Sequence, residues 1–188
     1  MGQYYHPIAL GKKANSVKAW WLAHDYDNGL KLMEHSYIGN HLCNAVERYL
    51  IDNPTRIVWA GDYADDEKGI EKNLYHIAGD RPSRKRAGDD TSDLPAGLFV
   101  VNHTKKEYYA RDEVKGYMVS GWNNERWEMK INPLALMTCE GNERGGGDYH
   151  PRERDTTELV GTWARDLIEV TAAEPVGYKK IEPYFTEG

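Results

Sequence analysis

Residues 140–150, "EGNERGGGDYH", are the segment of the chain best suited to bind a small polar molecule. Gly145, Gly146 and Gly147 let the backbone adopt positive φ angles and leave its N–H groups open to an anion. Arg144 can bind a phosphate or a carboxylate through two hydrogen bonds. Three side chains can accept hydrogen bonds from ribose hydroxyls or base amino groups, namely Glu140, Asn142 and Asp148. The alternative interpretation is a flexible loop between two strands.

The glycine run matches no established nucleotide-binding motif. No Gly-Lys-Ser/Thr ends it, as a P-loop requires, and it does not follow the GxGxxG pattern between a strand and a helix. The Ser-His-Asp order, the GxSxG elbow and the HExxH helix are missing from the sequence as well. We therefore favour a binding protein over an enzyme and leave the enzyme question open.

A second polar segment, "HDYDNGLKLMEH", begins at His24 and ends at His35. Counted from Asp25, the sixth residue of a calcium loop should be Gly and the twelfth Glu, but the chain has Leu30 and Ser36 there. The histidines of this region also match no established zinc spacing. We therefore predict no metal and no cofactor, and keep His24, Asp25 and His35 as candidate ligand-binding residues.

A third group lies in "WAGDY" and "GTWARD". A nucleobase needs an aromatic face to stack on, worth roughly 1–3 kcal/mol per base. Trp59 and Trp163 can supply that face, with Asp62 as an acceptor for hydroxyls and Arg165 as a partner for phosphate. The alternative is that both tryptophans belong to the core.

Composition narrows the classes of partner. The net charge is −6 over 188 residues, so a broad face for duplex nucleic acid is not expected. No apolar run is long enough to span a membrane, and "MGQYYHPIAL" has no secretory signal pattern. The two cysteines, Cys43 and Cys139, form no disulfide framework. These features predict a cytoplasmic protein with no membrane partner, and they leave its oligomeric state open.

Hydrophobic periodicity places the polar segments among strands and helices. Helices are expected from His41 to about Ile51 and from Asp65 to a point before Gly79, and residues 24–40 should form mainly a structured loop. Strands are expected in residues 3–10, 16–24, 56–63, 97–111 (as a hairpin), 126–140, from Trp163 to residue 172, and 177–185.

These elements predict a single α+β domain over residues 1–188. Its sheet should be mostly antiparallel, with about two helices and long structured loops, and nothing suggests βαβ crossovers. Residues 80–95, "DRPSRKRAGDDTSDLP", have no apolar period and carry a basic and then an acidic cluster. We predict a mobile loop there.

Six segments resemble a protein family found in bacteriophages and in gut and soil bacteria. The resemblance covers nearly the whole chain and carries over no activity, cofactor or site residue. It implies an accessory gene, and by analogy a role against host defence. The segments are "MGQYY", "HDYDNGLKLMEHSYIGN", "RIVWAGDYAD", "VVNHTKKEYY", "TCEGNERGGGDY" and "GTWARD".

The favoured hypothesis is a phage-type accessory protein that sequesters a nucleotide-like small molecule, such as a host immune signal. The first alternative is an enzyme acting on that ligand, with His35 or His150 as acid–base group and one of three carboxylates as its partner. Those carboxylates are Asp62, Glu140 and Asp148. The second alternative is an acidic inhibitor that blocks a host defence protein or a nucleic-acid-binding protein through residues 62–67 and 89–93.

Overall fold

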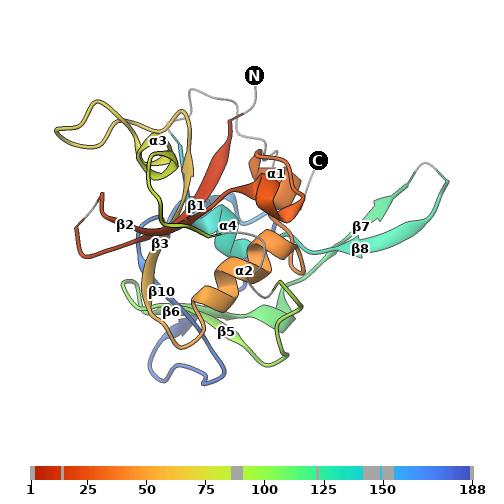
Figure 1. Cartoon of the computed structure of the whole chain (residues 1–188). Helices are drawn as coiled ribbons and strands as arrows, with labels where there is room; N and C mark the ends of the chain where they lie inside the picture. The colour runs from red at the N-terminus through yellow and green to blue at the C-terminus, as the bar shows by residue number, and fades with distance from the viewer. Residues whose placement is uncertain are drawn as a thin grey trace.

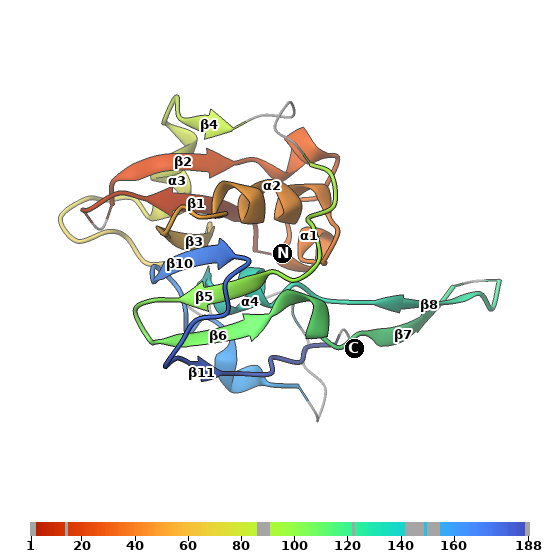
Figure 2. The ribbon, with the colours of Figure 1, turned by 90° about the horizontal axis from the view of Figure 1, so that it is seen from below.

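One large mixed sheet organises the chain (Figures 1 and 2). The computed structural model describes residues 3–13, 15–85, 91–121, 123–141, 149 and 155–186. Within these ranges the sheet has nine strands, of which β9 (Cys139–Glu140) pairs with β3 beside the main path. The main path runs β11 (Lys179–Lys180), β6 (Glu107–Ala110), β5 (Phe99–Asn102), β10 (Leu167–Thr171), β3 (Thr55–Gly61), β1 (Tyr5–Leu10), β2 (Val17–Trp21) and β4 (Arg84–Lys85).

The predicted α+β single domain is confirmed, but the sheet is mixed rather than purely antiparallel. The long strands pair antiparallel, as expected for hairpins and their neighbours. Three pairs are parallel: β2 with β4, β3 with β9, and β6 with β11. Each parallel pair joins a strand to a two-residue partner that returns from a long connection, so periodicity could not reveal it.

Strand β3 lies in the middle of the sheet, between β10 and β1. Strand β1 covers one edge from Tyr5 opposite Gly61 to Leu10 opposite Arg56. Strand β10 pairs with the start of the other edge, and β9 pairs with its end. In the gap between them, the Arg165 N–H donates to the Ile57 carbonyl at 2.8 Å.

Helices cover both faces of the sheet. Helix α2 (His41–Tyr49) begins as predicted, because the Asn40 side chain accepts from the Leu42 N–H at 2.9 Å. Helix α3 (Leu74–Gly79) begins at Leu74 rather than Asp65, because its cap is Asn73. It lies on the face opposite α2 (Figure 1). The short helical segments are η1 (Ala23–Tyr26), α1 (Leu32–His35), η2 (Arg111–Glu113) and η3 (Thr157–Leu159).

Two predicted strand segments take other conformations. Residues Pro133–Met137 form helix α4, with Pro133 in its first turn and the Asn132 side chain accepting from the Leu134 N–H. The segment is apolar on every side and fully buried, and such a short run has no period that separates helix from strand. Likewise, the expected strand begins at Leu167 rather than Trp163, because Arg165 has a φ of 65° and turns the chain.

The core has two unequal parts, one on each face of the sheet. The larger lies under α2 and α4 and contains the three indoles of Trp21, Trp59 and Trp163. The smaller lies under α3 and consists of Ile8, Leu10, Trp20, Val58, Ala60, Leu74 and Ala78. Strands β7 (Tyr117–Ser120) and β8 (Arg126–Met129) form a separate hairpin that projects from the body (Figure 2).

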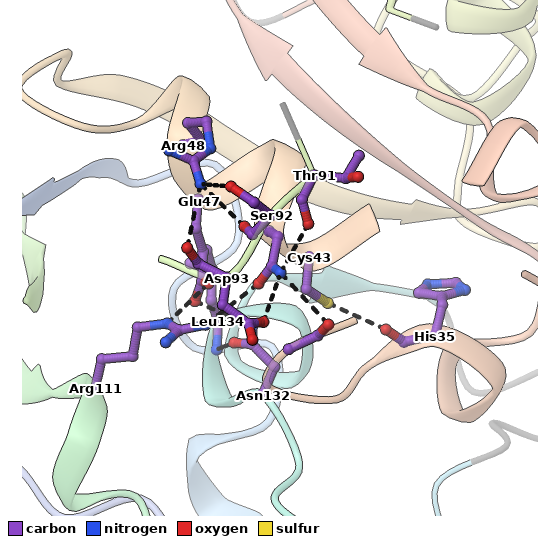
Figure 3. Close-up of polar contacts among 12 residues, drawn as sticks. His35, Cys43, Glu47, Arg48, Thr91, Ser92, Asp93, Arg111, Asn132 and Leu134 are labelled. Atoms are coloured by element: carbon purple, nitrogen blue, oxygen red, sulfur yellow. Dashed lines mark hydrogen bonds and ion pairs between the residues drawn. The ribbon is translucent and has the colours of Figure 1, made fainter. Parts of the chain in front are cut away.

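A buried ion pair between Glu47 of α2 and Arg111 joins α2 to the rest of the domain (Figure 3). The Glu47 carboxylate accepts from the Arg111 Nε at 3.0 Å and from the Asn132 amide at 3.0 Å. Arg111 also donates to the Asn44 side chain at 3.3 Å. Burial raises the pKa of Glu47, while Arg111 and Asn132 oppose the shift. The network therefore joins three elements that are distant in the sequence.

The segment predicted as a mobile loop is attached at both described ends. Arg84 and Lys85 form β4, and Arg48 donates to the Ser92 carbonyl at 2.9 Å (Figure 3). Asn44 donates to the Thr91 carbonyl at 3.1 Å. Residues 86–90 lie outside the described ranges.

Replacing Arg111 with Met should lower the free energy of unfolding by about 3–5 kcal/mol, because Glu47 stays buried without its cation. Urea denaturation of the purified variant measures this. The double variant Arg111→Met/Glu47→Leu should recover a large part of the loss. Lys115→Met, at an exposed ion pair with Glu182, is the control and should cost at most about 1 kcal/mol. A loss below that limit for Arg111→Met would refute the role of this pair.

Candidate functional site

A cluster of three charged side chains lies where β3 and β9 end, and we call it the carboxylate cluster: Glu67, Glu140 and Arg165. The Arg165 Nε donates to Glu140 at 2.6 Å, and its Nη1 donates to Glu67 at 3.2 Å. The Nη2 group is shared, because it donates to an oxygen of each glutamate. The cluster thus joins residues 25 and 98 positions apart.

The sheet positions each member of the cluster. Glu140 lies opposite Ala60 in the β3–β9 pair, so the two side chains share the face that α3 covers. Arg165 reaches the same region from the turn in the gap between β9 and β10. Glu67 lies in the connection from β3 to α3 and donates its N–H to the Lys72 carbonyl at 3.0 Å.

The charges in the cluster do not balance. Two carboxylates share one guanidinium, which leaves a formal charge of −1 in a site whose side chains are 7 % (Glu67), 25 % (Glu140) and 24 % (Arg165) exposed. Burial by itself would lower the pKa of Arg165, but hydrogen bonds to Glu140 and Glu67 outweigh it and raise the pKa. Arg165 therefore stays charged and paired with both glutamates, whose carboxylates can accept only from hydrogen-bond donors or cations.

Asp62 directly follows β3 and is bonded to the backbone of Tyr4, which precedes β1. The Asp62 Oδ1 accepts from the Tyr4 N–H at 3.0 Å, and the Asp62 N–H donates to the Tyr4 carbonyl at 2.9 Å. The residue before Asp62 is Gly61, whose Cα approaches the Glu140 carbonyl so closely that an added Cβ would be 3.0 Å from it. The rings of Tyr4 and Tyr63 are 42 % and 38 % exposed, so they present aromatic surface to solvent.

The two tryptophans expected to stack a base are buried in this structure. Trp59 is 1 % exposed and Trp163 is fully buried. Their Nε1 groups donate to the His35 Nε2 at 3.3 Å and to Glu107 at 3.1 Å. Neither indole has a face open to a ligand, so both tryptophans belong to the hydrophobic core. The reason is that burial of these large apolar rings, on a central strand and in the turn beside it, stabilises the folded state more than exposure would.

His35 is a structural residue here rather than a free acid–base group. Its Nδ1 contacts the Gly29 carbonyl at 3.0 Å and its Nε2 accepts from Trp59, so the neutral tautomer with Nδ1–H fits both contacts. Burial lowers the pKa of His35 to about 4. Both nitrogens are therefore in use in a ring with no exposed surface.

His24 and Asp25 lie away from the carboxylate cluster. They belong to η1, and Asp25 accepts from Arg84 of β4 at 2.7 Å. In the sheet, β4 is separated from β3 by β2 and β1. The structure therefore does not bring these two candidates together with Arg165.

Part of the predicted ligand loop lies outside the described residues. These candidates are Asn142, Arg144, Gly145, Gly146, Gly147 and Asp148, together with His150 of the enzyme alternative. The described chain reaches Gly141, directly after Glu140. Of the candidates that the structure describes, it joins Glu140 to Arg165, and it bonds Asp62 to Tyr4 and Asn73 instead.

Glu67 was missed as a site residue, and His6 is a buried polar residue outside the carboxylate cluster that the sequence did not reveal. From the sequence, Glu67 was named only as part of the acidic surface 62–67. In the structure it is 8 % exposed and accepts from Arg165. His6 is 4 % exposed and stacks on Tyr75, with ring centroids 4.0 Å apart. Its Nδ1 has no hydrogen-bond partner within the described ranges, and burial lowers its pKa to about 4. The alternation of β1 could have placed His6 on the buried α3 face.

A shallow groove of about 350 Å³ lies beside α3 and shares no residue with the carboxylate cluster. Its lining includes Ile70, Ile77 and Arg81, and the ion pair of Lys72 with Asp80 crosses it at 2.7 Å. We place the candidate site at the carboxylate cluster because its charges are partly buried, whereas the ion pair in the groove is exposed.

No protein-family model, curated protein or solved structure matches this chain. Among the described residues, no helix has the length and apolar character needed to cross a membrane. Those residues also contain no group of three or more His, Cys, Asp or Glu side chains arranged to hold a metal ion.

The two buried histidines should make stability fall in acid. Each pKa is about 4 in the folded state against 6.5 for a free histidine, so the unfolded chain takes up protons first. Their contribution is complete above pH 6.5 and is lost as the pH falls to about 4, up to about 3 kcal/mol per ring.

His6→Phe keeps a ring for Tyr75 and removes one of these groups. Between pH 7.5 and pH 5 the unfolding free energy of this variant should fall by about 2 kcal/mol less than that of the wild type. Val176→Ala, at a site that is 95 % exposed, is the control for urea denaturation at each pH. Equal pH dependence in the wild type and His6→Phe would show that His6 does not carry the effect.

Proposed function

We propose that the protein binds and sequesters a nucleotide-like small molecule at the carboxylate cluster. The observation that carries the proposal is the sharing of one guanidinium by Glu67 and Glu140 in a partly buried site. The unbalanced carboxylate oxygens suit the hydroxyls of a ribose and the amino groups of a base, because both are hydrogen-bond donors.

We propose that exposed groups at the start of β1 and after the end of β3 make the other contacts with such a ligand. Tyr4 and Tyr63 offer exposed rings for stacking, in the role that the sequence first suggested for the tryptophans. Asp62 adds an acceptor beside them. The glycine run of residues 145–147 follows Glu140 in the chain, and its sequence favours a phosphate-binding backbone.

The hydrogen bonds of two described candidate residues, Arg165 and His35, support binding of the ligand without its chemical change. Arg165 is paired with two carboxylates, and His35 uses both ring nitrogens inside the core. Neither side chain is free to transfer a proton. The phage-type resemblance favours a nucleotide signal of host defence as the ligand, bound in the bacterial cytoplasm.

Glu140→Gln should weaken nucleotide binding about tenfold, because it removes one charged acceptor and keeps the shape of the side chain. Isothermal titration measures this with ATP, GTP, NAD, AMP, IMP, inosine and cyclic dinucleotides. Glu113→Gln, an exposed carboxylate paired with Lys180, is the matched control and should bind as the wild type does. Folded wild-type protein that gives no heat with any of these compounds would refute the proposal.

Analysis of the compound after incubation distinguishes an enzyme from a protein that only binds its ligand. After incubation with each compound that binds, the protein is denatured and the released compound is analysed by chromatography and mass spectrometry. A sequestering protein returns the compound intact, and an enzyme returns a changed one.

A further inference from the structure

The β7–β8 hairpin is a two-stranded sheet that projects from the body of the domain (Figure 2). Two strands alone are at best marginally stable in water, because they lack further neighbours and a covered face. The residues Arg126–Glu128 of β8 are exposed, and the exposed fraction reaches 45 % for Trp127 and 60 % for Met118 of β7. The hairpin therefore carries apolar side chains and a strand edge that the described part of the chain leaves uncovered.

The hydrogen-bond pattern of the hairpin shows which backbone groups point away from β7. The Gly121 N–H donates to the Glu125 carbonyl at 2.9 Å, directly after the last registered pair of β7 and β8. In an antiparallel ladder, hydrogen-bonded pairs alternate with pairs whose N–H and C=O groups point outward. Counted from Glu125, the residues of β8 with outward backbone groups are Arg126 and Glu128.

A contact at the base of the hairpin agrees with this direction. The Lys130 carbonyl, two residues after Glu128, accepts from the Ile38 N–H at 2.9 Å, so it points away from β7 as well. Within the described ranges no strand lies beside Arg126 and Glu128 on that side. An open edge of this kind can accept one short strand from another chain.

The sequence of this edge is complementary to itself. Where two copies of β8 pair antiparallel about a two-fold axis at Trp127, Arg126 of each copy lies opposite Glu128 of the other. These are the residues with outward backbone groups, so each pair can exchange two backbone hydrogen bonds and also joins opposite charges. The two Trp127 side chains lie opposite each other in the type of pair that brings side chains closest. The outer edge of β7 would place Met118 opposite Ser120 and gives no charge pair.

We propose that the protein forms a two-fold symmetric dimer through the outer edge of β8. A second copy of the chain fits this edge because a two-fold interface must be self-complementary. The paired strands run in opposite directions, so the two bodies lie at opposite ends of the joined sheet. The interface is small, and we expect a dissociation constant on the order of tens of micromolar. It uses no residue of the carboxylate cluster and does not depend on the proposed function.

Sedimentation velocity of the full chain at concentrations from about 5 to 500 µM measures this association. The wild type should change from monomer to dimer over that range. Arg126→Glu and Glu128→Arg each place like charges opposite one another, so each should raise the dissociation constant about tenfold or more. Glu71→Arg, at an exposed site between β3 and α3, has the same charge change as Glu128→Arg and should dimerise as the wild type does.

Two further samples separate pairing at this edge from a general effect of charge. The double variant Arg126→Glu/Glu128→Arg restores opposite charges in both pairs and should dimerise as the wild type does. An equal mixture of the two single variants should form a heterodimer, because one copy supplies two acidic residues and the other two basic ones. At the lowest concentration all variants should keep the wild-type Tm, since both side chains are exposed.

Three results would overturn the proposal. The first is a wild type that stays monomeric at the highest concentration, which would leave the edge to a strand of a different protein. The second is a dimer that neither single variant weakens, because its interface would then lie elsewhere. The third is a double variant and a mixture that both stay monomeric, because the charges would then not pair as this register requires.

Discussion

The structure depends on one edge of β3, because two different strands, β10 and β9, pair with it. Strand β10 pairs with the start of that edge and β9 with its end, so the chain before β10 must turn in the gap between them. Arg165 takes a φ of 65° in this turn, and its N–H bonds to Ile57. That one backbone constraint directs a guanidinium to the end of β3, where the two glutamates meet it.

Two ionic clusters in the molecule differ in their ratio of carboxylates to guanidinium groups. Glu47 and Arg111 are matched one to one, deeply buried and completed by Asn132, which suits a role in holding α2 on the domain. In the carboxylate cluster, two glutamates share the one guanidinium of Arg165, and Arg56 donates to the Arg165 carbonyl. Stability explains the first arrangement, and the second is the basis of the proposed binding site.

Local patterns predicted much of the fold, and their failures have local causes. Strands β1, β2 and β3, the β5–β6 hairpin and helix α2 follow their periodicity and caps. Helix α4 was missed because its apolar residues are buried on every side. The parallel pairs were missed because their short partners carry no pattern, and strand pairing over long sequence separations is a property of the whole fold.

The sequence by itself determined the α+β class, most long elements and the chemical character of the segments around Asp62, Glu140 and Arg165. Only the tertiary structure decided that Glu140 and Arg165 bond to each other, that Glu67 joins them, and that Trp59 and Trp163 are buried. The physical reason is that residue types record which contacts a side chain can make. Which contacts form between residues 98 positions apart depends on the packing of the sheet between them.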